Sequence, residues 1–244
     1  MSKREPVAVV SRLVRYPLKS AAGESVQATQ VGWHGLRGDR RFAFLRPADP
    51  SGFPWLTARE VPELVTWRAA YVDPANPQHS DVFVQVPGEA PVSVRDGSLL
   101  TRLMAITNEP IQLAQLWSGI FDADDLAIIT TSSIEAACAA ASVAVDARRF
   151  RANVEVRPLE PGPFAEDRWV DSRFIFGDRQ DSARVRVCRR DKRCVVVNID
   201  PSTGTVMPGM FEGIVVNRKN NLGVYAKTEG PGSIAVGDTV YRLR

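Results

Sequence analysis

Short strand-like segments, separated by clusters of proline and glycine, are the feature of this sequence that most limits its fold. In the first half of the chain, β-branched or alternating apolar side chains occupy residues 7–18, 41–45, 82–86 and 92–94. Turn-forming clusters separate these segments at 47–54, 74–77 and 87–91. In the second half, strands are expected at 153–157, 184–187, 194–199 and 234–242, the last with a turn or bulge at Gly237-Asp238. Many short strands with this punctuation favour a barrel-like architecture.

Helix signals are fewer, so the predicted fold class is mainly β with a few helices (α+β). The candidates are 57–64, 96–104 and 132–142. The last is rich in alanine, and Ser132 with Glu135 three residues later is a capping-box pattern. Its backbone N–H groups offer a seat for an oxyanion or phosphate, although an ordinary N-cap is the commoner use of such a sequence. A long irregular stretch before residue 82 suggests a smaller β-rich N-terminal domain at 1–118 and a second domain at 119–244.

Composition narrows the classes of function. The chain has 244 residues, of which 44% are hydrophobic, enough for a sizeable core. No apolar run approaches the roughly 18 residues of a membrane helix, and no signal-peptide pattern follows the start, so we expect a cytoplasmic protein without a membrane partner. With only His34 and His79, a structural zinc site and Ser-His or Cys-His catalysis are poorly supported. His34, in a glycine-rich turn, is expected to be an exposed loop residue.

Basic residues are concentrated in three islands, although the formal net charge is only +3. The islands comprise Arg37, Arg40 and Arg41; Arg148, Arg149 and Arg151; and the basic residues of 184–193. Solvated faces are one interpretation of these islands. Nucleic-acid binding is another, but no recognised nucleic-acid motif accompanies the islands. A compact anion fits better, because arginine forks with nearby hydroxyl groups suit phosphate.

Cys194 follows the third island and precedes a turn signal, Asp200-Pro201-Ser202-Thr203-Gly204. A thiolate among cations can ligate a soft metal or act as a nucleophile, and a buried inert cysteine is the plain alternative. The lack of histidine partners weakens the nucleophile interpretation. Cys138 is expected in the core and Cys188 in a structural role, since the three cysteines are too widely spaced for a disulfide framework.

An ordered set of motifs runs from residue 16 to residue 240. The segments are Tyr16-Pro17-Leu18-Lys19-Ser20, residues 35–42, Leu56-Thr57-Ala58-Arg59, Phe150-Arg151-Ala152-Asn153, residues 193–204 and Gly237-Asp238-Thr239-Val240. Together they resemble the MOSC (molybdenum cofactor sulfurase C-terminal) superfamily with its N-terminal β-barrel domain, and most of all its amidoxime-reducing branch. Two positions depart from that branch. Lys192 stands where serine is common, and Thr131-Ser132-Ser133 stands where an acidic-small-serine pattern is common.

The resemblance implies a molybdenum–molybdopterin cofactor and a set of residues that bind it. Cys194 would ligate the metal and be the catalytic residue, while Lys19, Ser20, Arg40 and Arg151 would bind the phosphate end and the pterin. Further cofactor contacts would come from Thr131, Ser132, Asn153, Lys192 and Arg193. Residues Glu166, Asp167 and Trp169 would border the substrate mouth or, about equally, pack a loop.

The implied reaction is a two-electron reduction of N-hydroxylated compounds such as amidoximes, hydroxylamines and N-hydroxylated bases. Because the sequence shows no flavin or iron–sulfur motif, electrons would come from a separate electron-transfer protein of flavin, ferredoxin or cytochrome type. The alternative is a non-catalytic carrier of the cofactor or of persulfide sulfur on Cys194. At the level of the whole superfamily, the resemblance also implies pyridoxal phosphate binding. Neither nucleic acid nor membrane is an expected partner.

Overall fold

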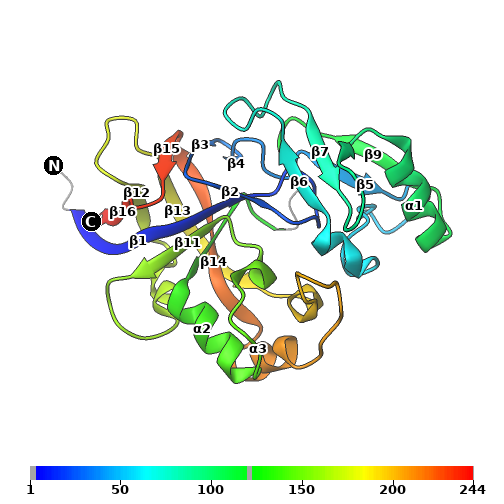
Figure 1. Ribbon diagram of the computed structural model, residues 1–244. Helices are drawn as coiled ribbons and strands as arrows, with labels where there is room; N and C mark the ends of the chain where they lie inside the picture. Colours follow the sequence, from blue (N-terminus) through cyan, green and yellow to red (C-terminus); the bar gives the residue numbers. More distant parts are fainter. Residues whose placement is uncertain (1–3, 120–122, 244) are drawn as a thin grey trace.

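The computed structural model describes residues 4–119 and 123–243 (Figure 1). Its strands are β1 (Arg4–Arg15), β2 (Glu24–Val26), β3 (Ala28–Gly32), β4 (Gly35–Leu36), β5 (Phe42–Leu45), β6 (Arg68–Tyr71), β7 (Val82–Gln85), β8 (Val92–Ser93), β9 (Gln112–Gln115), β10 (Leu126–Thr130), β11 (Val154–Pro158), β12 (Arg173–Phe176), β13 (Arg184–Lys192), β14 (Asn221–Gly230), β15 (Gly232–Ala235) and β16 (Thr239–Leu243). The α-helices are α1 (Gly97–Thr107), α2 (Thr131–Ala140) and α3 (Met210–Arg218). The described residues also contain four 3₁₀-helical segments: η1 (Pro62–Thr66), η2 (Ala147–Phe150), η3 (Ala165–Trp169) and η4 (Val195–Asn198). The mainly β fold with a few helices is therefore confirmed.

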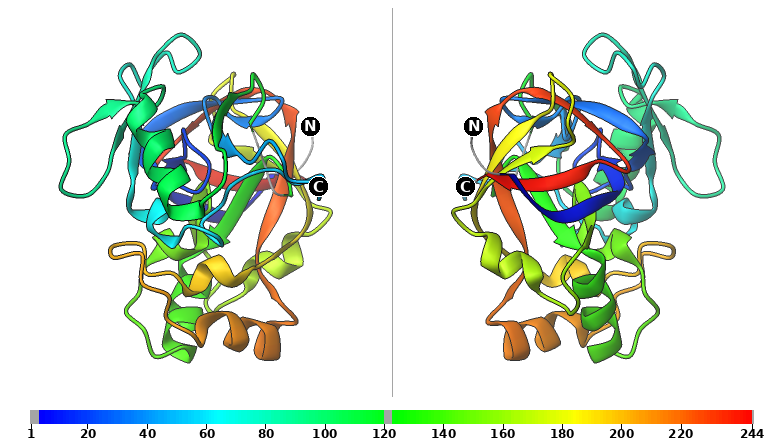
Figure 2. Two further views of the ribbon diagram at one scale, coloured as in Figure 1. Left: turned by 90° about the vertical axis from the view of Figure 1, so that its right-hand side faces the viewer. Right: turned by 90° about the vertical axis from the view of Figure 1, so that its left-hand side faces the viewer.

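A closed sheet forms the larger part of the molecule. Its order is β11-β10-β14-β13-β12-β16-β1-β2, and β1 also pairs with β11, which closes the ring and leaves β2 attached to β1. Strands β10 and β11 are parallel, whereas β1 is antiparallel to β11 and to β16. Figure 2 shows β1 and β16, from opposite ends of the sequence, lying side by side. Closure pairs the edges that an open sheet would leave exposed.

Alternating side chains of β1 explain why this segment enters the barrel. Ala8 and Val10 are buried in its core and Ser11 faces outward; the pairing with β11 shifts register between Val10 and Arg12, and Leu13 is buried beyond that shift. The core continues with branched or aromatic residues such as Val185 and Phe174 of the neighbouring strands. Successive strand side chains point to opposite faces, so the period-two pattern sends one set inward.

A second, smaller hydrophobic core lies beside the barrel. Its residues come largely from the β5–β9 ribbon, the β6-β7-β8 sheet and helix α1, which pack together (Figure 1). Phe44 and the fully buried Trp67 meet edge to face, with ring centroids 6.2 Å apart. Strand β1 belongs to the barrel although it precedes this unit in the sequence. The division into domains at 1–118 and 119–244 therefore stays a prediction.

Helices α2 and α3 pack against the barrel and against each other, as Figures 1 and 2 show. The core there contains Cys138, which is fully buried, so its expected structural place is confirmed. Helix α1 covers the predicted 96–104 segment, and Asp96 caps it by accepting a hydrogen bond from the Ser98 N–H at 2.8 Å. None of the helices among the described residues is long and apolar enough to cross a membrane.

The predicted strand at 194–199 is wrong. Strand β13 ends at Lys192, and the chain turns into η4, where Val197 N–H donates to the Cys194 carbonyl. Valine-rich sequence favours strands, but here Val197 packs with the α2–α3 core and Val196 against Ile199, on the other side of the turn. Tertiary packing thus overrides local propensity.

One other segment also differs from expectation. The helical turn predicted at 57–64 begins later, at Pro62, because Glu60 ties back the turn before it by accepting hydrogen bonds from Thr57 N–H and Oγ1. The segment predicted at 234–242, with a turn or bulge at Gly237-Asp238, is confirmed: β15 and β16 lie there, separated by a turn that contains these two residues.

Candidate functional site

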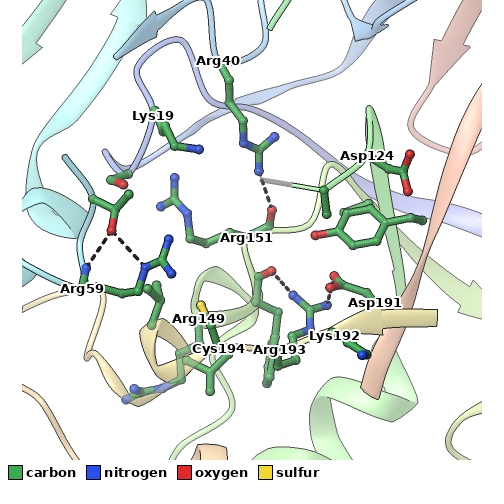
Figure 3. A pocket seen from close by; sticks show the side chains of 18 of the residues that line it. Lys19, Arg40, Arg59, Asp124, Arg149, Arg151, Asp191, Lys192, Arg193 and Cys194 are labelled. Atoms are coloured by element: carbon green, nitrogen blue, oxygen red, sulfur yellow. Dashed lines mark hydrogen bonds and ion pairs between the residues drawn. The ribbon is translucent and has the colours of Figure 1, made fainter. Parts of the chain in front are cut away.

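A cavity of about 540 Å³ opens beside the barrel and is lined by segments from both halves of the chain (Figure 3). Eight of the ten residues expected to form the site line it: Lys19, Ser20, Arg40, Arg151, Asn153, Lys192, Arg193 and Cys194. Their positions in the sequence are up to 175 residues apart, and the barrel strands and their connections bring them together. Thr131 and Ser132 are not among the lining residues.

Cys194 lies where β13 gives way to η4, and it is exposed. Its sulfur points toward the middle of the cavity in Figure 3. No hydrogen bond or ion pair within the described residues engages this sulfur, so it is available to a ligand. The expected turn follows it, with Asp200 Oδ1 accepting from Ser202 and Thr203 N–H at 2.9 and 3.1 Å.

The ring of Tyr16 holds two of the arginines. The guanidinium carbons of Arg40 and Arg151 lie 4.8 and 4.5 Å from its centroid. Arg40 also pairs with buried Asp39 and donates to the Arg151 carbonyl at 3.1 Å. Burial raises the pKa of Tyr16, against the lowering effect of the two arginines, so the phenol stays neutral.

The ring of Phe53 holds a second pair of cations. Lys19 Nζ lies 5.7 Å and the Arg59 guanidinium carbon 5.3 Å from its centroid. Lys19 is only 4% exposed. Arg59 is exposed, donates Nε–H to Thr57 Oγ1 at 3.2 Å, and meets no carboxylate within the described residues. In Figure 3, the ends of Lys19, Arg59 and Arg151 converge on the same space.

Three of the expected residues have left-handed backbone conformations. The φ angles of Ser20, Arg40 and Arg151 are 68°, 49° and 51°. Non-glycine residues adopt this region at a cost, and such residues cluster at ligand-binding sites. The Ser20 hydroxyl also accepts a hydrogen bond from Ala58 N–H at 3.2 Å, which joins it to the turn that carries Arg59.

Arg193 and Asn153 line the cavity, but their polar atoms are engaged within the protein. Arg193 donates to the carbonyls of Leu222 and Phe150, each at 2.7 Å, and its Nη2 lies 2.9 Å from Asp191 Oδ2. Asn153 Oδ1 accepts from Ala127 N–H at 3.2 Å. Both side chains therefore position the cavity walls. Lys192 is exposed and, like Arg149, points away from the middle of the cavity in Figure 3.

Two carboxylates balance part of this positive charge. Asp124 pairs with Arg189 at 2.7 Å and with Lys227 at 3.6 Å. Asp191 is 1% exposed, and burial, partly offset by Arg193 and the Tyr225 hydroxyl, raises its pKa to about 6. Burial also raises the pKa of Tyr225, so the phenol keeps its proton at neutral pH.

The predicted capping box at Ser132 and Glu135 is wrong. Thr130 is the N-cap of α2, and its hydroxyl accepts from Ser133 N–H at 3.2 Å. Buried Glu166 lies against the same helix start and accepts from Thr130 Oγ1 and Ser133 Oγ at 2.8 and 2.9 Å. Of the two alternatives for this helix start, the structure supports the ordinary N-cap, at Thr130 rather than Ser132, with a buried carboxylate beside it.

The loop alternative for residues 166–169 is the one that the structure supports. Glu166 and Trp169 are buried, and Asp167 forms ion pairs with Arg190 and Arg218. Sequence reasoning missed Phe53 and Tyr225 and gave Arg59 no role. The motif Leu56-Thr57-Ala58-Arg59 is the signal that could have suggested Arg59, since it matched the family segment.

Replacement of Glu166 by alanine is expected to destabilise the protein by about 3 kcal/mol, because it removes a buried acceptor and leaves two hydroxyl donors unsatisfied. Glutamine, which keeps one oxygen acceptor, should cost about 1 kcal/mol. Urea unfolding measures both. Glu160→Ala is the control, because this exposed carboxylate pairs with the exposed Arg168, and its effect should stay within about 0.5 kcal/mol. Equal midpoints for Glu166→Ala and Glu160→Ala would contradict the prediction.

Comparison with protein families agrees with this geometry. The model of the MOSC N-terminal beta barrel domain matches residues 7–125, and that of the MOSC domain matches residues 120–241. The chain therefore belongs to the family of MOSC proteins that carry this N-terminal domain.

Two named proteins are similar to this chain over nearly its whole length. Mitochondrial amidoxime-reducing component 1 of Mus musculus is 25% identical over 292 aligned residues, covering 98% of this chain and 83% of the relative. The Homo sapiens protein of the same name is also 25% identical and covers 98% and 84%. Among solved structures, the YuaD protein of Bacillus subtilis aligns over all of both chains with a TM-score of 0.54 at 14% identity, which supports the fold.

Proposed function

We propose that this protein binds the molybdenum cofactor in the cavity and uses it to reduce N-hydroxylated compounds. One observation carries the proposal: an exposed thiol faces a cavity onto which three cations, Lys19, Arg59 and Arg151, converge. Membership in the MOSC family and similarity to proteins named amidoxime-reducing components support the choice of cofactor and of substrate class.

The residues present fit such a group. A molybdenum–molybdopterin cofactor combines a metal that accepts a thiolate ligand with a pterin that ends in phosphate. Cys194 is the thiol among the lining residues and would ligate the metal. Lys19, Arg59 and Arg151 supply ammonium and guanidinium donors for phosphate and pterin. Ser20 lies beside them and would add a hydroxyl contact.

When bound, the cofactor would supply the two-electron redox chemistry, and the chain's own residues would bind and orient the reactants. Tyr16 and Phe53 fix the directions of four cations, which reduces the entropy lost when a phosphate binds. Arg40, Arg193 and Asn153 position the walls. Electrons would come from a separate protein of flavin, ferredoxin or cytochrome type. Pyridoxal phosphate has no part in the proposal, and a cytoplasmic location remains a proposal, since both relatives are named mitochondrial.

A carrier of the cofactor or of persulfide sulfur is the second candidate. The exposed and unengaged Cys194 sulfur favours it, because a carrier needs a thiol that a partner can reach. A carrier would bind the cofactor or the sulfur at Cys194, as the reductase binds its cofactor, but it would not reduce N-hydroxylated compounds.

Production of the protein in a host that makes the molybdenum cofactor separates the two candidates. The reductase should contain about one molybdenum and one pterin per chain and should reduce benzamidoxime with reduced viologen as the electron donor. Protein without molybdenum from such a host would contradict the proposal. Molybdenum without turnover, or one extra sulfur on Cys194 in the mass spectrum, would favour the carrier.

A further inference from the structure

A carboxyl group and a phenol lie together in the cavity wall, and the proposed cofactor contacts use neither. Asp191 is near the end of β13 and Tyr225 is on the adjacent strand β14; both line the cavity beside Cys194. Asp191 is almost completely buried, whereas Tyr225 is half-buried and therefore the more open of the two. A group that can release a proton thus lies behind a hydroxyl that can pass it on.

The charged groups around Asp191 come from three parts of the fold. Arg193 contacts it directly, Arg189 lies on the same strand, and Arg40 approaches from the loop after β4. Each of these arginines is also held by another acceptor. Arg193 donates to two carbonyls, Arg189 pairs with Asp124, and Arg40 pairs with Asp39. Their attraction therefore compensates only part of the cost of burying a carboxylate, and Asp191 exchanges its proton near neutral pH.

We propose that Asp191 supplies, by way of the Tyr225 hydroxyl, one of the two protons consumed when an N-hydroxylated compound is reduced in the cavity. The inference rests on the proposed function. For a hydroxylamine, the N–O bond breaks, two electrons arrive from the electron-transfer protein, and two protons complete an amine and a water molecule. The phenol gives its proton to the departing oxygen and takes the proton of Asp191, which solvent then restores. Tyr225 is the catalytic residue in this scheme, and Asp191 acts through it.

The first test needs no cofactor. Carbon-13 NMR of aspartate carboxyl groups in the cofactor-free protein should show one group with a midpoint near pH 6, absent from Asp191→Asn. The folded protein then binds this proton more tightly than the unfolded chain does. Accordingly, the stability of wild type relative to Asp191→Asn should fall as pH rises from the ordinary value of 3.8 through about 6. A midpoint below about 5 in the spectrum would overturn the inference.

The second test is the pH dependence of kcat/KM in the loaded enzyme. Wild-type activity should fall as pH rises through about 6, and Asp191→Asn should lose this step together with about a hundredfold in rate, the usual contribution of proton transfer. Tyr225→Phe, which removes only the hydroxyl, should lose a similar factor while Asp191 still titrates. An Asp191→Asn or Tyr225→Phe enzyme with the wild-type profile and rate would overturn the proposal.

Asp171→Asn is the matched control, because this exposed carboxylate lies outside the cavity lining, pairs with Arg186 and should not alter the midpoint. Molybdenum content, measured for every variant, distinguishes a failure of the proposed function from a failure of the proton path. Protein without molybdenum would contradict the proposed function, whereas loaded variants with an unchanged pH profile would contradict only the proton path.

Discussion

Cys194→Ala is expected to abolish molybdenum binding and to lower reductase activity at least about a hundredfold. Loss of a residue that merely supports a metal ligand typically costs 10- to 100-fold, and loss of the ligand itself should cost no less. Cys194→Ser should behave similarly, because a hydroxyl group is a harder donor and remains protonated near neutral pH. Metal analysis and benzamidoxime reduction of the purified variants measure both effects.

Pterin content should fall in parallel with molybdenum content in this variant, because the proposed cofactor carries the metal on the pterin and the two bind as one group. Cys188→Ala is the matched control. Cys188 is a partly exposed thiol on β13 that donates a weak hydrogen bond to the Arg186 carbonyl at 3.4 Å. Wild-type molybdenum content in Cys194→Ala would rule out the ligand role.

The barrel could be predicted from sequence because its strands carry a local signal. The β-branched residues of 7–18 and the helix candidate at 96–104 are signals within short segments, and the structure forms β1 and α1 there. In the segment after Cys194, the local sequence signal predicts the wrong secondary structure. Its valines suit a strand, yet η4 forms there because Val196 and Val197 pack into separate clusters that only the folded chain creates.

The candidate site shows the same division. Eight of the ten residues that the sequence motifs predicted for the site line one cavity in the structure. What sequence could not reveal was which side chains are already engaged. Arg193 is basic and adjacent to the cysteine, but Leu222 and Phe150, distant in sequence, take its donors. The start of α2 is similarly occupied by Glu166, which lies 36 residues after Thr130.

Gly223 illustrates a backbone requirement of the site. Its φ is +81°, and an added Cβ would lie 2.9 Å from the Ile128 carbonyl oxygen and 3.0 Å from Arg193 Nη2. Only a residue without a side chain therefore lets β14 pass close to β10 and to the Arg193 guanidinium. The wall of the cavity depends on this approach as much as on its charged groups.

Arg151→Gln is expected to weaken cofactor binding by about ten- to a hundredfold. A charge-assisted hydrogen bond contributes about 1.5–3 kcal/mol, and about 1.4 kcal/mol corresponds to a tenfold change in affinity. The fold should survive, because the Arg151 carbonyl that accepts from Arg40 belongs to the backbone and remains in place. Pterin retained after dialysis measures the effect in the loaded protein, and calorimetric titration with pyrophosphate measures it in the cofactor-free protein.

Arg168→Gln provides the comparison for this experiment. Arg168 is exposed, and its ion-pair partner is Glu160, outside the cavity lining. The two substitutions change the net charge by the same amount, so a general electrostatic effect would weaken pyrophosphate binding equally in both. A local effect at Arg151 should also decline less steeply with added salt, because partly buried charges are screened less than exposed ones. Equal affinities in the two variants would show that Arg151 does not contact the anion, and the proposed phosphate site would then have to rest on Lys19 and Arg59.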